Sequence, residues 1–116
     1  WLHNKKLKPE FRVNDVIFLY FLIAQIMNKI LVLITLSDNG IETIKANPDL
    51  PKREMEFVHQ WKDEDILDSF FISVSRKDAV LIFKTIDEPT AKNLIESLPY
   101  FPFMAKIDYH NLNQQF

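Results

Sequence analysis

Residues 69–84, SFFISVSRKDAVLIFK, carry the clearest structural pattern of the chain, because they predict a β-hairpin. Over the first six of these residues, Phe70, Ile72 and Val74 alternate with their neighbours at the period of two that is typical of a strand. A polar turn follows at residues 75–78, and residues 79–84 are a second short apolar run. Two such runs joined by a polar turn predict a pair of antiparallel strands.

One strand and one helix are expected before this hairpin. Residues 29–36, KILVLITL, are a short apolar run that ends at a Ser-Asp-Asn-Gly turn, as expected of a buried strand. A helix is predicted from Pro51 to near Trp61, because proline suits the first helical turn and apolar residues recur on one face. Residues 41–50 are ambiguous, because two prolines each disfavour helical backbone at the residue before them.

The segment after the hairpin predicts a second helix and a last strand. Asp87 suits the N-cap of a helix with Pro89 in its first turn, and this helix should end at Leu98, before the next proline. Residues 100–109 alternate as a strand, and residues 111–116 form a polar tail. The order βαββαβ favours an α+β, ferredoxin-like fold, in which two helices cover one face of a four-stranded antiparallel sheet.

The hairpin carries apolar residues on both faces of the predicted sheet. Phe70 and Phe71 point to opposite faces, and so do Leu81 and Ile82. A second apolar face has to be covered, either by residues 1–26 or by another subunit. We favour another subunit, with two sheets closing face to face into a dimeric α/β barrel, and so expect a homodimer or a higher homo-oligomer.

The first 26 residues differ from the rest and are interpreted as an N-terminal extension of a domain that covers residues 27–116. They contain four basic and two acidic residues and lead into the apolar run of residues 16–24. The first methionine is Met27, where we expect the natural domain to begin. The extension is then either non-native sequence or a helical or disordered tail.

Two other interpretations of this region are weaker. A signal peptide would need a cleavage site with small residues, which does not follow the apolar run. A membrane span over residues 16–36 would bury Gln25, Asn28 and Lys29 near its middle, which is costly. We therefore expect a cytoplasmic protein without a membrane partner.

Composition excludes several classes of function. The chain has 116 residues, enough for one domain, and a formal net charge of −2, so a nucleic-acid partner is not expected. It has no cysteine, which excludes disulfides, thiolate metal sites and a cysteine nucleophile. Its single glycine excludes glycine-rich phosphate loops, and its three histidines have no metal-ligand spacing. We expect neither a metal nor a cofactor.

One segment resembles a known family. Leu98-Pro99-Tyr100-Phe101-Pro102-Phe103-Met104 is similar to the L-P-x-F-P-aromatic-M signature of the muconolactone Δ-isomerase family, in a looser resemblance that spans residues 27–108. The resemblance implies a ferredoxin-like subunit that pairs into dimeric α/β barrels. It also implies an isomerase of aromatic-compound degradation, which moves a carbon–carbon double bond within a small unsaturated lactone without a cofactor.

The resemblance also implies a catalytic carboxylate. Glu54 lies where the family has an acidic residue in its first helix, and one carboxylate can remove and return a proton if burial brings its pKa near neutrality. The alternative for Glu54 is an ordinary solvated helix acid. A donor or a cation should stabilise the enolate oxygen, and Lys106, Arg53 and Tyr100 are the candidates for binding the substrate, with Lys29 a further cation.

The sequence departs from the family in its first strand. Ile30 and Val32 stand where the family has histidine and lysine, so the wall of the site is more apolar than an anionic lactone would favour. A second hypothesis is therefore a non-catalytic, homo-oligomeric α/β-barrel module that binds a small apolar ligand. A third is a membrane-tethered form of either, which would require that residues 29–36 do not pair in a sheet.

Overall fold

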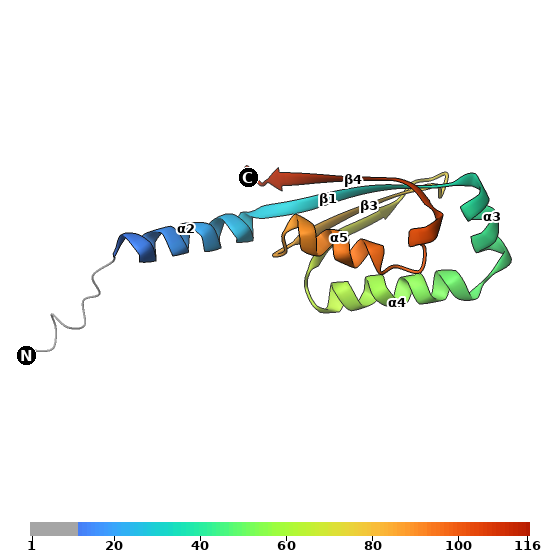
Figure 1. The fold of residues 1–116 in the computed structure, drawn as a ribbon, viewed down its shortest axis with the longest axis horizontal. Helices are drawn as coiled ribbons and strands as arrows, with labels where there is room; N and C mark the ends of the chain where they lie inside the picture. The colour runs from blue at the N-terminus through green and yellow to red at the C-terminus, as the bar shows by residue number, and fades with distance from the viewer. Residues whose placement is uncertain (1–11) are drawn as a thin grey trace, which may run out of the picture.

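The computed structural model describes residues 12–116, and the molecule is elongated because its N-terminal helix projects from the rest (Figure 1). In chain order its elements are α2 (Val13–Met27), β1 (Asn28–Leu36), α3 (Asp38–Ala46), α4 (Asp49–Asp63), β2 (Leu67–Ile72), β3 (Asp78–Lys84), α5 (Glu88–Glu96), the 3-10 helix η1 (Phe101–Phe103) and β4 (Met104–Asn113).

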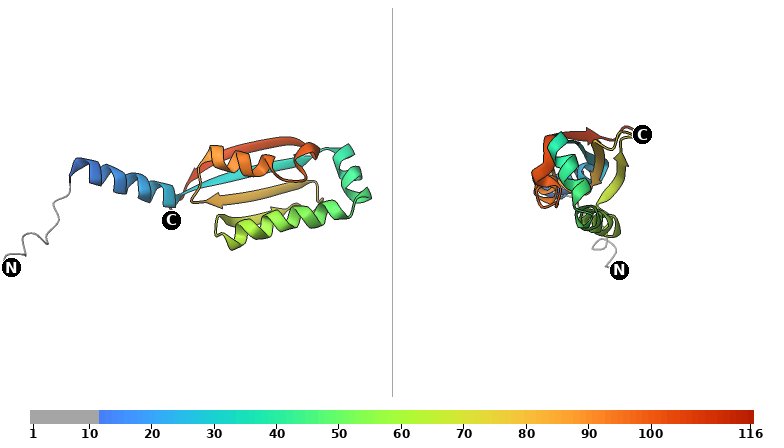
Figure 2. Two further views of the ribbon diagram at one scale, coloured as in Figure 1. Left: turned by 60° about the horizontal axis from the view of Figure 1, so that its bottom comes forward. Right: turned by 90° about the vertical axis from the view of Figure 1, so that its right-hand side faces the viewer.

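The four strands form one antiparallel sheet in the order β2-β3-β1-β4. Figure 2 shows α4 and α5 on the same side of this sheet, while α3 lies at the end of β1 that is remote from α2. The protein is therefore α+β, as predicted, and its arrangement is compatible with a ferredoxin-like fold. The two central strands, β1 and β3, are far apart in the sequence. Their pairing connects the β2–β3 hairpin to the rest of the sheet.

The core lies between the sheet and the helices α4 and α5. Ile30 lies opposite Phe83 and Val32 opposite Leu81 in the β1–β3 pair, and all four side chains are buried. Trp61 of α4 packs edge-on against Phe83, with ring centroids 5.4 Å apart. Aromatic contacts of this kind add to the free energy gained by burying the rings. The apolar faces predicted for the two helices are thus the faces that meet the sheet.

Most of the ambiguous residues 41–50 are helical: residues 41–46 belong to α3 and residues 49–50 to α4. Ser37 caps α3 by accepting a hydrogen bond from the N–H of Gly40 at 2.9 Å, and the helix ends at Ala46, shortly before Pro48. Helix α4 then begins at Asp49, two residues before the expected start, and continues to Asp63 rather than ending near Trp61. Its prolines are tolerated because the first N–H groups of a helix have no intrahelical partner.

The strands that flank the core are shifted from their predicted bounds. Strand β2 begins at Leu67 and ends at Ile72, so Val74 lies in the turn and is fully exposed. Strand β4 begins only at Met104, because the residues before it form η1. It continues to Asn113, through part of the predicted polar tail, since the backbone of β1 pairs with it along its whole length.

Helix α2 projects from the end of β1 (Figure 1), and β1 follows it without an intervening loop. Its apolar side chains that the structure describes are largely exposed: Val13, Val16, Ile17, Phe18, Leu19, Tyr20, Leu22 and Ile23. The alternative of a membrane span over residues 16–36 is wrong, because residues 28–36 pair with β3 and β4. Within residues 12–116, no helix has the length and apolar character needed to cross a bilayer. The basic residues before Phe11 lie outside the described residues.

The face of the sheet opposite α4 and α5 is apolar at the centre of β1, β2 and β3, as the hairpin pattern predicted, whereas β4 contributes the polar Lys106 and Asp108 to it. We call it the open face and define it by Leu31, Leu33, Phe71, Val80 and Ile82, which alternate with the core residues of their strands. Phe71 is 59% exposed and Leu33 is 37% exposed in the single chain. The second subunit that would cover this face stays a prediction.

Candidate functional site

A cavity of about 310 Å³ lies between α3, α4 and the helix-covered face of the sheet. Its walls are mainly apolar side chains, among them Ile41 of α3, Met55 of α4 and Ile72 of β2. The segment that begins at Leu98 closes one side. The family-like heptapeptide and the predicted first helix therefore meet at one site.

Glu54 contributes a buried carboxylate to this cavity. Only 9% of the residue is exposed. Among residues 12–116, Glu54 is the one charged residue that is buried. It lies on the face of α4 that also carries Val58 and Trp61, so the packing of α4 on the sheet takes it out of water. Glu54 is therefore not an ordinary solvated helix acid.

One hydrogen bond holds the Glu54 carboxylate. The backbone N–H of Tyr100 donates to Oε1 at 2.9 Å, while Oε2 accepts no hydrogen bond from residues 12–116. Burial raises the pKa of Glu54 from 4.5 to about 7, and the bond from Tyr100 opposes this rise by stabilising the ionised form. Both protonation states are therefore populated near neutral pH, which is what a group that removes and returns a proton requires.

The heptapeptide segment is fixed by contacts with α3. The N–H of Ser37 donates to the carbonyl oxygen of Phe103 at 2.8 Å. Gly40 lies so close to η1 that a Cβ at this position would be 2.6 Å from Cβ of Phe103. The single glycine of the chain thus allows the close approach that positions the Tyr100 N–H beside Glu54.

Tyr100 also contributes its side chain to the cavity wall. Burial, followed by the nearby charge of Glu54, raises the pKa of the Tyr100 hydroxyl, and the charge of Arg76 opposes this rise. The hydroxyl therefore keeps its proton at neutral pH and can donate a hydrogen bond to a ligand oxygen. Of the residues predicted from the sequence, the structure brings Glu54 and Tyr100 together.

The other predicted binding residues lie elsewhere. Arg53 precedes Glu54 but is exposed and contacts Asp49 at 3.5 Å, and it does not line the cavity. Lys106 lies on β4 opposite Thr35, on the open face, where Nζ is 3.6 Å from Asp108. Consecutive residues of a helix point in different directions. Arg53 therefore points away from the cavity although it is next to Glu54 in the sequence.

Lys29, Ile30 and Val32 of β1 do not line the cavity, whereas Ile34 and Leu36 of the same strand do. Lys29 pairs with Asp68 of β2 at 2.7 Å. Ile30 and Val32 are buried in the core beneath the helices, where the resemblance implies histidine and lysine. The first strand therefore supplies no polar group to the site at these two positions.

The sequence reasoning missed the basic residues at the rim. Arg76 and Lys77 of the β2–β3 turn and Lys45 of α3 line the cavity. Residues 75–78 were interpreted only as a polar turn, and no local pattern shows that this turn lies near Glu54. Within residues 12–116, no group of three or more histidine, aspartate or glutamate side chains could hold a metal ion.

Searches against protein-family models and against curated proteins found no match for this chain.

Proposed function

We propose that the chain is a cofactor-independent isomerase, similar to muconolactone Δ-isomerase, in which Glu54 moves a proton within a small unsaturated lactone. The observation that carries the proposal is the buried Glu54 carboxylate in a mostly apolar cavity, with a pKa near 7. The supporting sequence signal is the heptapeptide at residues 98–104, whose Tyr100 N–H contacts that carboxylate.

The reaction follows from the chemistry of an activated C–H bond. The ionised Glu54 removes a proton from a carbon that is conjugated with the lactone carbonyl, and the electron pair of that C–H bond moves into the conjugated system as an enolate. The protonated Glu54 then returns the proton to the other end of that system. The double bond has moved, the carboxylate is regenerated, and no oxidation or reduction occurs.

Tyr100 supplies the donor that this mechanism needs. Tyr100 lines the cavity, the charge of Glu54 acts on its hydroxyl, and that hydroxyl stays protonated at neutral pH because its pKa is raised. A hydrogen bond to the carbonyl oxygen of the substrate becomes stronger as negative charge develops on that oxygen, so it stabilises the transition state more than the ground state. The walls are mostly apolar, and a hydrogen bond is electrostatically stronger in such surroundings than in water.

A second candidate is a non-catalytic, homo-oligomeric α/β-barrel module that binds a small apolar ligand. Two observations favour it: the walls of the cavity are mostly apolar, and the open face exposes Phe71 and Leu33 in the single chain. Two copies that pack these faces together would form the dimeric α/β barrel, and the module would need no acid or base.

Turnover separates the two candidates. We would incubate the full chain with muconolactone and related unsaturated lactones in deuterated water and follow isomerisation and deuterium incorporation by NMR. The Glu54→Gln variant should lose at least about a hundredfold in kcat/KM, since a positioned base contributes roughly 10²–10⁴-fold. Glu56→Gln is the matched control, because Glu56 is an exposed acid on the same helix.

Each result has a clear meaning. Equal rates for the unchanged chain and Glu54→Gln would contradict the role of Glu54. Absence of turnover in the unchanged chain with every lactone would favour the ligand-binding module.

A further inference from the structure

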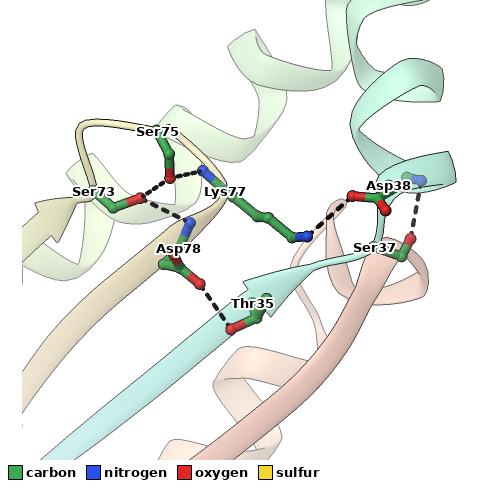
Figure 3. A network of polar contacts seen from close by, with 8 residues as sticks. Thr35, Ser37, Asp38, Ser73, Ser75, Lys77 and Asp78 are labelled. Carbon is green, nitrogen blue, oxygen red and sulfur yellow. Dashed lines mark hydrogen bonds and ion pairs between the residues drawn. The ribbon is translucent and has the colours of Figure 1, made fainter.

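The turn between β2 and β3 is held in place from two sides (Figure 3). The hydroxyl of Ser73 accepts a hydrogen bond from the N–H of Asp78 at 3.0 Å and lies 3.0 Å from the hydroxyl of Ser75. Oδ1 of Asp78 accepts a hydrogen bond from the hydroxyl of Thr35, on β1, at 2.8 Å. The turn is therefore fixed relative to the central strand, and residue 76 has a defined place at the cavity rim.

Arg76 occupies an unusual backbone conformation in this turn. Its φ is 65°, in the left-handed region that favours glycine, and its N–H donates to the carbonyl oxygen of Ser73 at 2.8 Å. The turn could form with less strain if residue 76 were glycine. Asp65 and Thr85 have a similar φ, but of these three residues Arg76 is the one that lines the cavity. Strained residues of this kind cluster at functional sites.

Arg76 is the unpaired cation of the cavity. Of the other basic residues that line it, Lys77 pairs with Asp38 at 3.0 Å and Lys45 lies 3.9 Å from Glu42. Arg76 forms no ion pair within the part of the chain that the structure describes, residues 12–116. Two acids also line the cavity, Glu54 and Asp78, and Oδ1 of Asp78 accepts a hydrogen bond from Thr35 rather than from Arg76. The guanidinium group of Arg76 is thus free to bind a ligand at this mostly apolar cavity.

We infer that the cavity takes a small, mostly apolar monocarboxylate, and that Arg76 binds the carboxylate group at the rim. A guanidinium presents two parallel N–H donors that match the two oxygens of a carboxylate. The apolar walls suit the body of such a molecule, and the volume of about 310 Å³ suits a ligand with a single ring. The inference rests on the proposed function in one respect, since it assumes that the ligand body reaches Glu54.

A pair of matched ligands tests this inference without requiring turnover. Benzoate and its neutral amide, benzamide, have nearly the same shape and differ in charge. We would titrate each into the full chain and into Glu54→Gln at pH 6, and follow the backbone amide signals of Arg76 and Tyr100 by NMR. Both proteins should bind benzoate about tenfold more tightly than benzamide, the preference expected for one charge-assisted contact at a solvated rim.

The variants place this preference at one side chain. Arg76→Gln should bind the two ligands equally, whereas Arg53→Gln, which removes an exposed arginine outside the cavity, should keep the preference. Arg76→Gly should also lose it while unfolding at a higher temperature, because glycine relieves the left-handed backbone. If Arg76 had only a structural role, Arg76→Gly would not lose the preference for benzoate while its unfolding temperature rises.

Several results would overturn the inference. These are equal affinity of the unchanged chain for benzoate and benzamide, no binding of either, or a preference that persists in Arg76→Gln. Failure of the proposed isomerase is recognised separately, because a chain that turns over no lactone can still show the Arg76-dependent preference for benzoate.

Discussion

The backbone N–H of Tyr100 and Oε1 of Glu54 lie 2.9 Å apart, although 46 residues separate them in the chain. This hydrogen bond joins α4 to the segment that precedes β4. It stabilises the ionised carboxylate, but one neutral donor does not compensate for the loss of water around a buried charge, so the pKa of Glu54 is about 7. The balance between these two effects leads to the first two predictions.

Turnover should depend on the ionised form of Glu54. If this carboxylate is the base, kcat/KM should rise about tenfold per pH unit below pH 7 and level off above it, because the group has a pKa of about 7. Initial rates with a lactone substrate from pH 5 to pH 9 measure the profile. A rate that does not change between pH 5 and pH 8 would contradict the assignment.

The free energy of unfolding should fall as the pH rises. Glu54 has a raised pKa in the folded protein, so between pH 4.5 and about 7 the folded chain holds a proton that the unfolded chain has lost. At about 1.4 kcal/mol per pKa unit, ionised Glu54 costs about 3 kcal/mol above pH 7. Glu54→Gln should therefore be more stable than the unchanged chain at pH 8.

Urea unfolding at pH 5 and pH 8 measures this difference. Glu56→Gln, on the exposed side of α4, serves as the control and should follow the unchanged chain at both pH values. If Glu54→Gln keeps the full pH dependence, the carboxylate does not titrate as the structure indicates.

The approach of α3 to η1 should tolerate no side chain at residue 40. In Gly40→Ala, the new Cβ would lie 2.6 Å from Cβ of Phe103 and 2.8 Å from its carbonyl oxygen, so η1 or α3 must move. Overpacking of this kind costs roughly 1–3 kcal/mol. Thermal unfolding measures the loss, and Asn39→Ala, at the exposed neighbouring position, should leave the stability within about 0.5 kcal/mol. Equal stability of both variants would show that this contact is loose.

The open face should hold two copies together if the proposed dimer exists. Val80→Lys places a charge at the centre of this face, so it should convert a dimer into a folded monomer. Light scattering during size-exclusion chromatography measures the mass, and circular dichroism checks the fold. Val74→Lys is the control, because Val74 is fully exposed in the turn. An unchanged chain that is monomeric at high concentration would contradict the dimer.

Local patterns predicted most of the elements. The alternation around Phe70 predicted β2, and the apolar run of residues 29–36 predicted β1. Asp87 caps α5, as expected. The misplaced bounds lie where neighbours in space decide. Residues 111–113 are polar and were predicted as a tail, but they extend β4 because β1 offers its backbone groups for pairing.

The candidate site was predicted only in part. Glu54 and Tyr100 meet at the cavity, whereas Arg53 and Lys106 lie outside it and Arg76 was not considered. The resemblance selected the carboxylate, but no sequence signal indicates that Arg76, 22 positions after Glu54 in the chain, lines the same cavity.

Most helices and strands, and the apolar faces they carry, can be predicted from local sequence, because periodicity and capping act between residues a few positions apart. Only the tertiary structure decided that Glu54 is buried, that the Tyr100 N–H reaches it and that Arg76 lies at the cavity rim. The physical reason is that desolvation and charge depend on distance in space, and the packing of α4, η1 and the β2–β3 turn around one cavity sets those distances.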